Sequence, residues 1–326
     1  MKAVFMPNRR DDGLIRITEE HPELNWTIAC TPEERAAAIV DTEILVLAEA
    51  VCCAELGKLL LNAKKLRWIQ FSTAGIDQCV RFGLPTHIPI TSGSGIKAPT
   101  VAEHAISLLL ALVRHLRDLE TERTAQRWSR TTLFPKIGSL EDATLVIVGY
   151  GHIGQDIARK AKAFDMRTIV VSRAAKPGPN VDEIMPRARL REALALADAV
   201  ILCTQPSPET DNMIGKDELA IMKKTACIVN VARGEMIEEP ALIEALKEGR
   251  LAGAALDVTL KEPLPADHPL WHMDNVLISP HVAGAGGDGG GYKRFAARFS
   301  ENLRRLKSGE PLLLQIAPEH LEQPVA

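Results

Sequence analysis

The chain has 326 residues, 46% of them hydrophobic and 25% charged, with a formal net charge of -3, which is enough chain for two domains with a core each. Lysine and arginine are scattered along the sequence, so no basic region is available to bind a nucleic-acid backbone. The N-terminal apolar run is too short for a signal peptide, and the longest apolar stretch, residues 105–113, is too short to cross a bilayer, so we expect a cytoplasmic protein that binds no membrane.

Short apolar runs alternate with amphipathic stretches along the whole chain, which is typical of βαβ units in a parallel sheet with helices on both faces. In the first hundred residues the pattern predicts strands at residues 2–6, 44–48, 66–72 and 88–92. Between residues 144 and 281 it predicts strands at 144–149, 167–172, 199–204, 226–231, 252–258 and 276–280. The fold class we predict is therefore α/β, with two doubly wound parallel-sheet domains.

The cysteines show no CxxC pair and no ligand-like spacing with histidines. We expect most of them to be small core or surface residues, and Cys203 and Cys227 to behave as small hydrophobes inside strands. The six are Cys30, Cys52, Cys53, Cys79, Cys203 and Cys227.

A domain boundary is indicated where a Gly/Pro/Ser-rich loop precedes a long apolar pattern with three-four spacing. This pattern predicts one long helix that connects the domains, with a single buried face made by Val101, Ala105, Leu108, Leu112, Leu116 and Leu119. The chain crosses back at a glycine run, after which residues 293–309 predict an amphipathic helix ending at Gly309. We therefore predict a substrate domain of residues 1–99 plus 287–326 and a dinucleotide-binding domain of residues 100–286.

The glycine run itself has two interpretations. Glycine disfavours a helix, so the first turn of the following helix is in doubt. The run is either a hinge that assists domain closure or a tolerant linker. Its members are Gly284, Gly286, Gly287, Gly289, Gly290 and Gly291.

Gly149, Gly151 and Gly154 form a GxGxxG motif directly between a predicted strand and a predicted helix. In that setting Gly149 makes the tight turn, Gly151 lets the backbone approach a pyrophosphate, and Gly154 lets the helix pack closely on the strand. The amides of the first helical turn would bind the anion. The alternative is a strand-to-helix turn with packing glycines only.

The next predicted strand ends in Ser172, followed by Arg173 and, slightly further, Lys176. An aspartate or glutamate at this position would bind the ribose diol of NAD, but no carboxylate is there, and a guanidinium can pair with a 2′-phosphate. We therefore expect NADP as the cofactor, with NAD possible. The alternative is a solvated surface arginine that does not discriminate between the two.

Four charged or titratable residues follow predicted strands at the edge where ligands bind in a doubly wound sheet. Arg233 follows "CIVNVA", Asp257 and Glu262 follow "AGAAL", and His281 follows "VLISP". Each alone could be an ordinary surface residue. Together at one sheet edge they predict an active site.

The sequence is similar to the D-isomer-specific 2-hydroxyacid dehydrogenase family over almost the whole chain, most densely from Thr100 to Gly284. The resemblance is carried by "TVAEHAISLLLAL", "GYGHIG", "NVARGEMI", "ALIEALKEGRLAGAALDV", "EPLP", "HPLW" and "ISPH". It implies a Rossmann-type cofactor domain plus a flavodoxin-like substrate domain, and NAD(P)-dependent reduction of a small 2-keto acid to a D-2-hydroxy acid.

The resemblance implies that Arg233, Glu262 and His281 form the catalytic site. Histidine can give a proton to the keto oxygen near neutral pH, and a carboxylate beside it favours the charged imidazole and fixes its orientation. The arginine can bind the substrate carboxylate and polarise the carbonyl.

The resemblance also assigns Ala74 and Gly75 as backbone amides facing the substrate carboxylate, although a simple turn after "LRWIQF" is the alternative. Asp257 would contact the cofactor, or instead cap a strand-end turn. The other positions that match cofactor contacts are His152, Ile153, Thr204, Pro206 and Ala232.

Glyoxylate, hydroxypyruvate or another small 2-keto acid is the expected substrate, because no extra arginine cluster indicates a substrate phosphate. Two alternatives remain: formate- or phosphite-type oxidation, and a non-catalytic dinucleotide-sensing binding protein. The resemblance also implies a homodimer. The connection between residues 100 and 139, with Trp128 and Phe134, is the expected contact, unless these side chains pack on their own domain.

Overall fold

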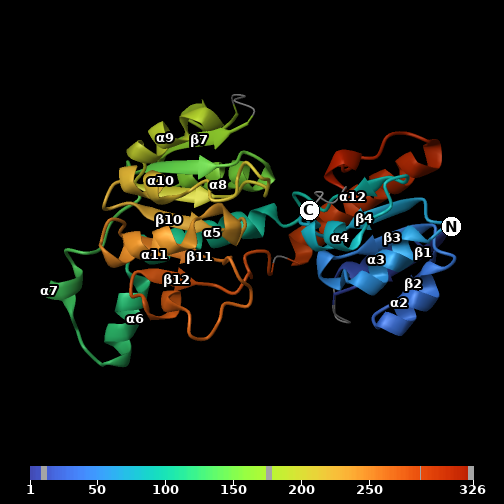
Figure 1. Cartoon of the computed structure of the whole chain (residues 1–326), viewed down its shortest axis with the longest axis horizontal. Helices are drawn as coiled ribbons and strands as arrows, with labels where there is room; N and C mark the ends of the chain where they lie inside the picture. The colour runs from blue at the N-terminus through green and yellow to red at the C-terminus, as the bar shows by residue number, and fades with distance from the viewer. Residues whose placement is uncertain (9–12, 174–177, 287, 322–326) are drawn as a thin grey trace. The chain divides into compact units, whose positions relative to one another are not determined.

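The computed structural model describes residues 1–8, 13–173, 178–286 and 288–321 of the chain. It divides into two compact units, one formed by Met1–Lys97 with Gly286–Ala326 and the other by Ala98–Ala285 (Figure 1). In the described residues no helix combines the length and the hydropathy needed to cross a membrane.

The first unit contains a five-stranded sheet in the order β2-β1-β3-β4-β5. All neighbouring strands run parallel. This order is that of flavodoxin-like folds and confirms the predicted flavodoxin-like architecture of one domain. The strands are β1 Lys2–Met6, β2 Asn25–Ile28, β3 Ile44–Leu47, β4 Trp68–Phe71 and β5 Ile90–Thr91.

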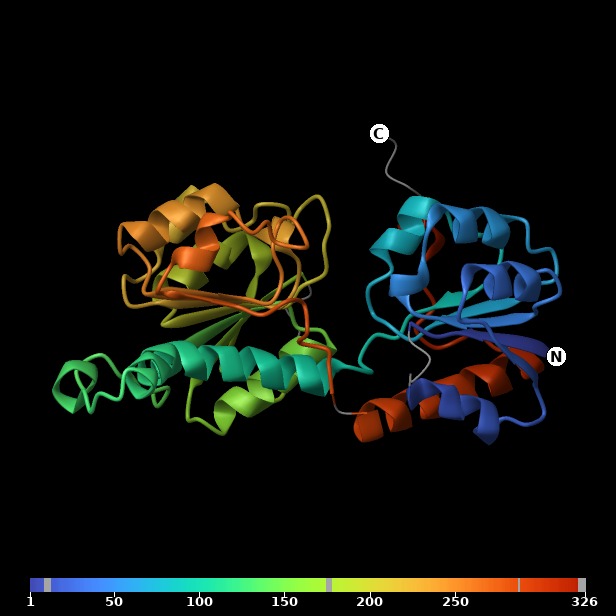
Figure 2. The same ribbon diagram turned by 90° about the horizontal axis from the view of Figure 1, so that it is seen from below.

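Helices cover both faces of this sheet, as Figure 2 shows with α12 and α1 on one side and α2, α3 and α4 on the other. Successive side chains of a strand point to opposite faces, so Leu45 and Leu47 of β3 pack under α2 to α4 while Ile44 and Val46 pack against α12. The helices are α1 Ile17–Glu20, α2 Pro32–Ile39, α3 Ala54–Leu61, α4 Asp77–Phe82 and α12 Asp288–Ser308.

Cys52 and Cys79 form a disulfide in this unit. Cys52 lies just before α3 and Cys79 within α4, and these two helices are packed together. Both cysteines are buried, as expected of small core residues, but their pairing was not predicted. The two cysteines are 27 positions apart, and only the folded chain brings them together.

The second unit contains a seven-stranded parallel sheet in the order β12-β11-β10-β9-β6-β7-β8. Its first strand, β6, lies between β7 and β9, so the strand order reverses there as in a Rossmann fold. The predicted fold class is confirmed. The strands are β6 Thr144–Val148, β7 Arg167–Ser172, β8 Glu183–Pro186, β9 Ala199–Leu202, β10 Cys227–Asn230, β11 Gly253–Leu256 and β12 Val276–Ile278.

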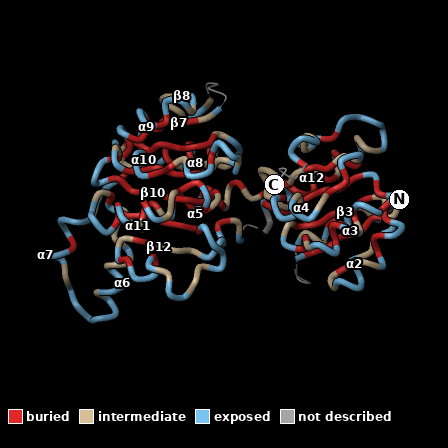
Figure 3. Tube along the Cα trace, in the orientation of Figure 1, coloured by how far each residue is buried: buried red, intermediate tan, exposed pale blue. Residues whose placement is uncertain are grey.

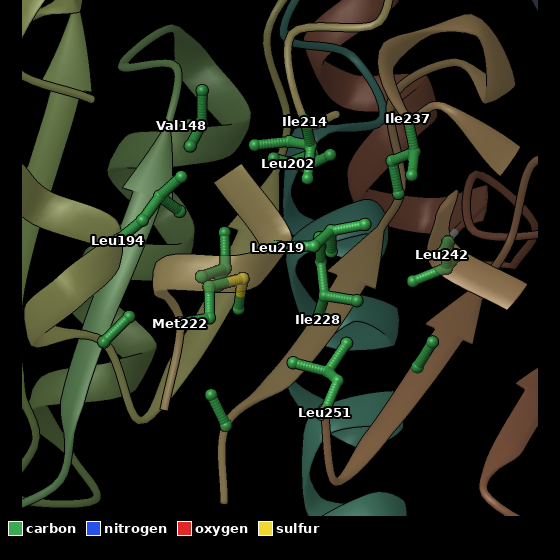
Figure 4. Close-up of a cluster of buried hydrophobic side chains, with 14 of the residues drawn as sticks. Val148, Leu194, Leu202, Ile214, Leu219, Met222, Ile228, Ile237, Leu242 and Leu251 are labelled. Carbon is green, nitrogen blue, oxygen red and sulfur yellow. The ribbon is translucent and has the colours of Figure 1, made fainter. Parts of the chain in front are cut away.

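Both faces of this second sheet are also buried, and its strands lie in the buried interior of Figure 3. Leu145 and Ile147 of β6 pack against α5 and α8, whereas Val146 and Val148 belong to the cluster under α9, α10 and α11 (Figure 4). The helices are α5 Ala98–Val113, α8 His152–Lys162, α9 Leu190–Leu196, α10 Lys216–Ile221 and α11 Glu239–Lys247. Two further helices, α6 Leu116–Thr124 and α7 Arg130–Leu133, extend away from this body in Figure 1.

The prediction of a single long helix after residue 100 was wrong. Helix α5 ends at Val113, His115 adopts a left-handed φ of 52°, and α6 starts as a separate helix at Leu116. Leu116 and Leu119 are exposed, so they do not continue the buried face of Val101 and Ala105. The three-four spacing of apolar residues continues from α5 into α6, so this spacing alone could not predict the break at His115.

The glycine run ends inside a helix rather than before it. Helix α12 starts at Asp288, so Gly289, Gly290 and Gly291 belong to its first turn, and it ends at Ser308 with Gly309 at a φ of 73°. The predicted C-terminal end is confirmed, whereas the doubt about the first turn was unfounded. Gly287 lies outside the described residues.

Candidate active site

The glycine motif forms the turn between β6 and α8. Gly149 has a φ of 110°, and a β-carbon there would lie 2.8 Å from the amide nitrogen of Thr204. A β-carbon on Gly154 would lie 2.1 Å from the carbonyl oxygen of Gly149. A side chain at either position would clash with these backbone atoms, so both positions need glycine.

Gly151 differs from the other two glycines, because a β-carbon there would have no atom within 4 Å. It is the N-cap of α8 and supplies no side chain to the first amides of that helix. His152 and Ile153 are the first two residues of α8, and His152 is exposed. The turn thus presents open space in front of an eleven-residue helix N-terminus, which fits a dinucleotide pyrophosphate.

Thr204 and Pro206 follow β9, the strand next to β6 at the reversal of strand order. Before them, the thiol of Cys203 lies 3.3 Å from the carbonyl oxygen of Gly149 and donates to it. Burial raises the pKa of this thiol to about 12, so it stays protonated and serves as a donor that ties β9 to the glycine turn.

Ser172 ends β7, and Arg173 follows it with an exposed side chain. Lys176 lies outside the described residues. Tyr150, inside the glycine motif, donates from its hydroxyl to the carbonyl of Pro179 at 2.8 Å, and burial raises its pKa. The motif is therefore connected to the segment that follows Arg173.

Arg233 lies at the carboxyl end of β10 in a turn held by Asn230. The Nδ2 atom of Asn230 donates to the carbonyl of Arg233 at 2.8 Å, and its Oδ1 atom accepts from the amide of Ala232 at 3.0 Å. One guanidinium nitrogen of Arg233 donates to the carbonyl of Ala232 at 2.8 Å. A β-carbon on Gly234 would lie 2.1 Å from the carbonyl carbon of Thr259, so the Arg233 turn packs on the loop after β11.

Glu262 and His281 meet through a direct hydrogen bond. The Nδ1 atom of His281 lies 2.7 Å from Oε2 of Glu262, and Oε1 of Glu262 accepts from the amide of Thr259 at 3.2 Å. His281 follows β12 and Glu262 follows β11. Because these two strands are adjacent and parallel, the two residues leave the same edge of the sheet and come into contact. A histidine held by a carboxylate through Nδ1 leaves Nε2 available for acid-base chemistry.

Asp257 is buried at the end of β11, where it caps a turn. Its carboxylate accepts from the amides of Val282 and Ala283, each at 3.0 Å, and from the hydroxyl of Ser279 at 2.5 Å. This is the strand-end role that sequence reasoning held open beside a cofactor contact.

Ala74 and Gly75 lie in the first unit, in the turn after β4. The hydroxyl of Thr73 donates to the carbonyl of Gly75 at 3.0 Å and accepts from the amide of Glu49 at 3.1 Å. Ala74 is exposed. The turn is thus fixed by a side-chain hydroxyl, while its exposed backbone can face a ligand.

Sequence reasoning missed three supporting residues: Asn230, Ser279 and His104. Asn230 and Ser279 stand inside the quoted motifs "NVARGEMI" and "ISPH", and His104 inside "TVAEH". A polar residue within a buried strand, as with Asn230, was the available signal, because buried polar groups need partners. In the described residues no group of three or more His, Cys, Asp or Glu side chains could bind a metal ion.

Comparison with known proteins gives one family. Residues 106–283 match the D-isomer specific 2-hydroxyacid dehydrogenase family, NAD binding domain. A glyoxylate reductase of Thermococcus gammatolerans is 34% identical over 323 residues, which cover 94% of this chain and 93% of that protein.

Solved structures also match, among them the following two. A D-isomer specific 2-hydroxyacid dehydrogenase family protein from Aeromonas salmonicida superimposes with a TM-score of 0.85 at 29% identity, covering 97% of this chain and 98% of that one. A D-isomer specific 2-hydroxyacid dehydrogenase from Xanthobacter autotrophicus, solved in complex with NADPH and MES, gives 0.82 at 26% identity, with 98% and 99% covered. With the Rossmann-type unit and the His281–Glu262 pair, these matches establish that the chain belongs to the D-isomer specific 2-hydroxyacid dehydrogenase family and is an NAD(P)-dependent oxidoreductase of 2-keto and D-2-hydroxy acids.

Proposed function

We propose that this protein reduces a small 2-keto acid of the glyoxylate or hydroxypyruvate type to the D-2-hydroxy acid, and that it prefers NADPH. The observation that carries the proposal is the hydrogen bond between His281 Nδ1 and Glu262 Oε2, at the carboxyl ends of two adjacent strands. In this proposal the unit Ala98–Ala285 binds the cofactor, and the other unit binds the substrate.

His281 is the proposed acid. The reduced nicotinamide supplies the hydride that the carbonyl carbon accepts. The imidazole gives a proton to the carbonyl oxygen, so that one keto group, one hydride and one proton yield one hydroxyl group. Glu262 accepts the Nδ1 hydrogen and fixes the orientation of the imidazole for the transfer.

Arg233 is the proposed binding group for the substrate carboxylate. Its guanidinium forms a planar fork that stays charged, so it can pair with a carboxylate and polarise the neighbouring carbonyl. The proposed partners on the substrate side are the backbone amides of Ala74 and Gly75. The buried Asn230, which holds the Arg233 turn, supports this role because it limits the positions the guanidinium can take.

The proposed cofactor contacts centre on Gly149, Gly151 and Gly154 with the first amides of α8. Preference for NADPH is supported by the absence of a carboxylate at Ser172 and by the exposed guanidinium of Arg173, which can pair with a 2′-phosphate. The Xanthobacter autotrophicus relative binds NADPH in its crystal structure. The further proposed contacts are His152, Ile153, Thr204, Pro206 and Ala232, whereas the carboxylate of Asp257 is engaged in capping the turn after β12.

The substrate class is tested by following oxidation of NADPH, and separately of NADH, with glyoxylate, hydroxypyruvate, pyruvate and bulkier 2-keto acids. We expect turnover with a small 2-keto acid, faster with NADPH. Reduction of NADP by formate or phosphite in place of any keto acid reduction would contradict the proposal. Tight dinucleotide binding with no turnover on any acid would favour a binding protein instead.

A homodimer formed through α6 and α7 is part of the proposal. Trp128 is 93% exposed and Phe134 68% exposed, and an open surface hollow of about 460 Å³ is lined by residues from Glu120 to Arg127. Large exposed aromatic side chains are typical anchors of protein interfaces. Light scattering should give a dimer mass for the native chain and a monomer mass for the double variant Trp128→Ser, Phe134→Ser; a monomeric native chain would contradict it.

We also propose a cytoplasmic location. Residues 2–6 form β1, which lies between β2 and β3, so this N-terminal segment is part of the folded sheet. Cell fractionation should find the keto acid reductase activity in the cytosol, and its recovery from a membrane or extracellular fraction would contradict the location.

A further inference from the structure

One histidine of α5 is connected to the turn that carries His281. The Nε2 atom of His104 lies 2.8 Å from Oγ of Ser279 and 3.3 Å from Oδ1 of Asp257. The hydroxyl of Ser279 donates to the same Oδ1 atom at 2.5 Å. A helix and a loop therefore share one hydrogen-bond network, centred on a carboxylate whose side chain is only 1% exposed.

The direction of these hydrogen bonds follows from the donors present. A serine hydroxyl has one hydrogen, and Ser279 gives it to Asp257. Oγ of Ser279 can then only accept from His104, so Nε2 of His104 carries a hydrogen. The buried carboxylate is thus surrounded by donors, as an ionised group away from water requires. Those donors are the amides of Val282 and Ala283 and the hydroxyl of Ser279, which His104 supports in turn.

The turn that this network holds has an uncommon backbone conformation. His281 has a φ of 53°, in the left-handed region that residues with a β-carbon rarely adopt unless the surroundings impose it. The amide of His281 donates to the carbonyl oxygen of Asp257 at 2.8 Å, while the Asp257 carboxylate binds the next two amides. Because one residue holds the turn by both its backbone and its side chain, moving that carboxylate would move the imidazole relative to Glu262.

We propose that His104 is a positioning residue for the reaction, acting through Ser279 and Asp257 to aim His281 at Glu262. This inference rests on the proposed role of His281 as the acid. Packing alone does not account for His104, because its ring is hydrogen-bonded to Ser279 and 26% of its side chain is exposed. An apolar side chain would fill the same space but would give no hydrogen to Ser279.

The first test replaces His104 and compares kcat with cofactor binding. His104→Leu should lower kcat about 10- to 100-fold, the loss typical of a misplaced catalytic group. The dissociation constant for NADPH should stay near its wild-type value, while the Tm falls slightly because Ser279 loses a hydrogen-bond donor. His104→Gln should recover most of kcat, because the amide nitrogen of glutamine can donate to Ser279. His272→Leu, at an exposed histidine of the same unit, is the matched control and should leave kcat unchanged.

Ser279→Ala removes the link between His104 and Asp257. It should cause a loss of kcat similar to that of His104→Leu, and the double variant should lose little more than either single variant, since both changes break one network. Should the leucine variant not fold, Ser279→Ala carries the same test. Additive losses would mean that the two residues act separately, which would overturn the inference.

A readout that needs no turnover separates this inference from the proposed function. Spectra of 15N-histidine-labelled protein should show His104 with its hydrogen on Nε2, and His104→Leu should shift the His281 ring signals while His272→Leu leaves them in place. Unchanged His281 signals, a wild-type kcat in His104→Leu, or no recovery by His104→Gln would overturn the positioning role. A wild-type protein that reduces no 2-keto acid would refute the proposed function, while the spectra would still decide the role of His104.

Discussion

The Nδ1 atom of His281 lies 2.7 Å from Oε2 of Glu262, although 18 residues separate the two in the chain. The pair meets because β11 and β12 are adjacent and parallel, so the loops that follow them leave the same edge of the sheet. A second histidine–glutamate pair in the same unit, His268 and Glu239, has its atoms 3.1 Å apart and has no proposed role in the reaction. The two pairs allow the proposed catalytic contact to be compared with one that has no proposed role in the reaction.

Removing the acid or its partner should lower kcat to different extents. His281→Gln should reduce kcat about 10²- to 10⁴-fold, the usual contribution of a general acid. Glu262→Gln should reduce it at least about tenfold, because the imidazole loses the group that orients it. Glu239→Gln is the matched control and should keep the wild-type kcat. Steady-state kinetics with a 2-keto acid measure all three, and equal losses in both glutamate variants would contradict the assignment.

Two glycines of the motif should respond differently to the same substitution. Gly151→Ala adds a β-carbon that meets no protein atom within 4 Å, so the free energy of unfolding should stay close to that of the wild type. Its affinity for NADPH should fall, because the added carbon stands where the pyrophosphate approaches. Gly154→Ala puts a β-carbon 2.1 Å from the carbonyl oxygen of Gly149, so it should lower the stability as well. Denaturant titration and NADPH binding measure the two effects. Retained NADPH affinity in Gly151→Ala would argue against a pyrophosphate at this turn.

The preference for NADPH over NADH should depend on Ser172, at the end of β7, and on Arg173, which follows it. Arg173→Ala should raise the KM for NADPH about 10- to 100-fold and leave the KM for NADH unchanged, because a charged hydrogen bond to the 2′-phosphate contributes about 1.5–3 kcal/mol. Ser172→Asp should shift the preference toward NADH through repulsion of that phosphate. Arg191→Ala, at an exposed arginine paired with Glu218 at 3.0 Å, should change neither value. A wild-type KM for NADPH in Arg173→Ala would refute the proposed role of Arg173 in the preference for NADPH.

Two buried thiols should make the protein less stable in alkali. Burial raises the pKa of Cys203 to about 12 and of Cys227 to about 11, from an ordinary value of 9.0. In the unfolded chain these thiols ionise near pH 9 and in the folded chain they do not. The free energy of unfolding should therefore be unaffected below pH 9 and fall from pH 9 to 11, by up to about 1.4 kcal/mol per pH unit for each thiol.

The measurement is denaturant unfolding at pH 8, 9.5 and 10.5. Cys203→Ala should show a smaller fall with pH than the wild type, and Cys30→Ala, at a cysteine outside the sheets, serves as the control. At pH 8 an alkylating reagent should leave Cys203 and Cys227 unmodified in the native protein, because the raised pKa keeps both thiols protonated. Rapid labelling of Cys203 at pH 8 would contradict its burial.

The fold was predictable where the hydrophobic pattern was strong. All ten predicted strands are present. Eight of them are central parallel strands, which are buried on both faces and read as apolar runs, and the other two, β5 and β12, are edge strands with short apolar runs of their own. The two strands that the pattern missed, β2 and β8, each form the opposite edge of one sheet. Edge strands are paired on one side only, so "NWTI" and "EIMP" can carry polar residues and a proline and leave no apolar signal.

The site was predictable as a set of strand-end residues, whereas its internal connections were not. Spacing and resemblance indicated His281 and Glu262, but the contact of His104 with Ser279 joins residues 175 positions apart and depends on how α5 packs against the sheet. The Cys52–Cys79 disulfide was missed for the same reason, since its pairing follows from the packing of α3 on α4. Local sequence carries little information about such contacts.

The most direct test of the proposed reaction follows the hydride itself. The protein is incubated with hydroxypyruvate and NADPH that carries deuterium at both C4 positions of the nicotinamide, and the glycerate formed is analysed by mass spectrometry and on a chiral column. We predict D-glycerate with one deuterium at C2, formed faster than with equally labelled NADH. Glycerate without deuterium, the L enantiomer, or no glycerate from any labelled cofactor would contradict a hydride transfer assisted by His281.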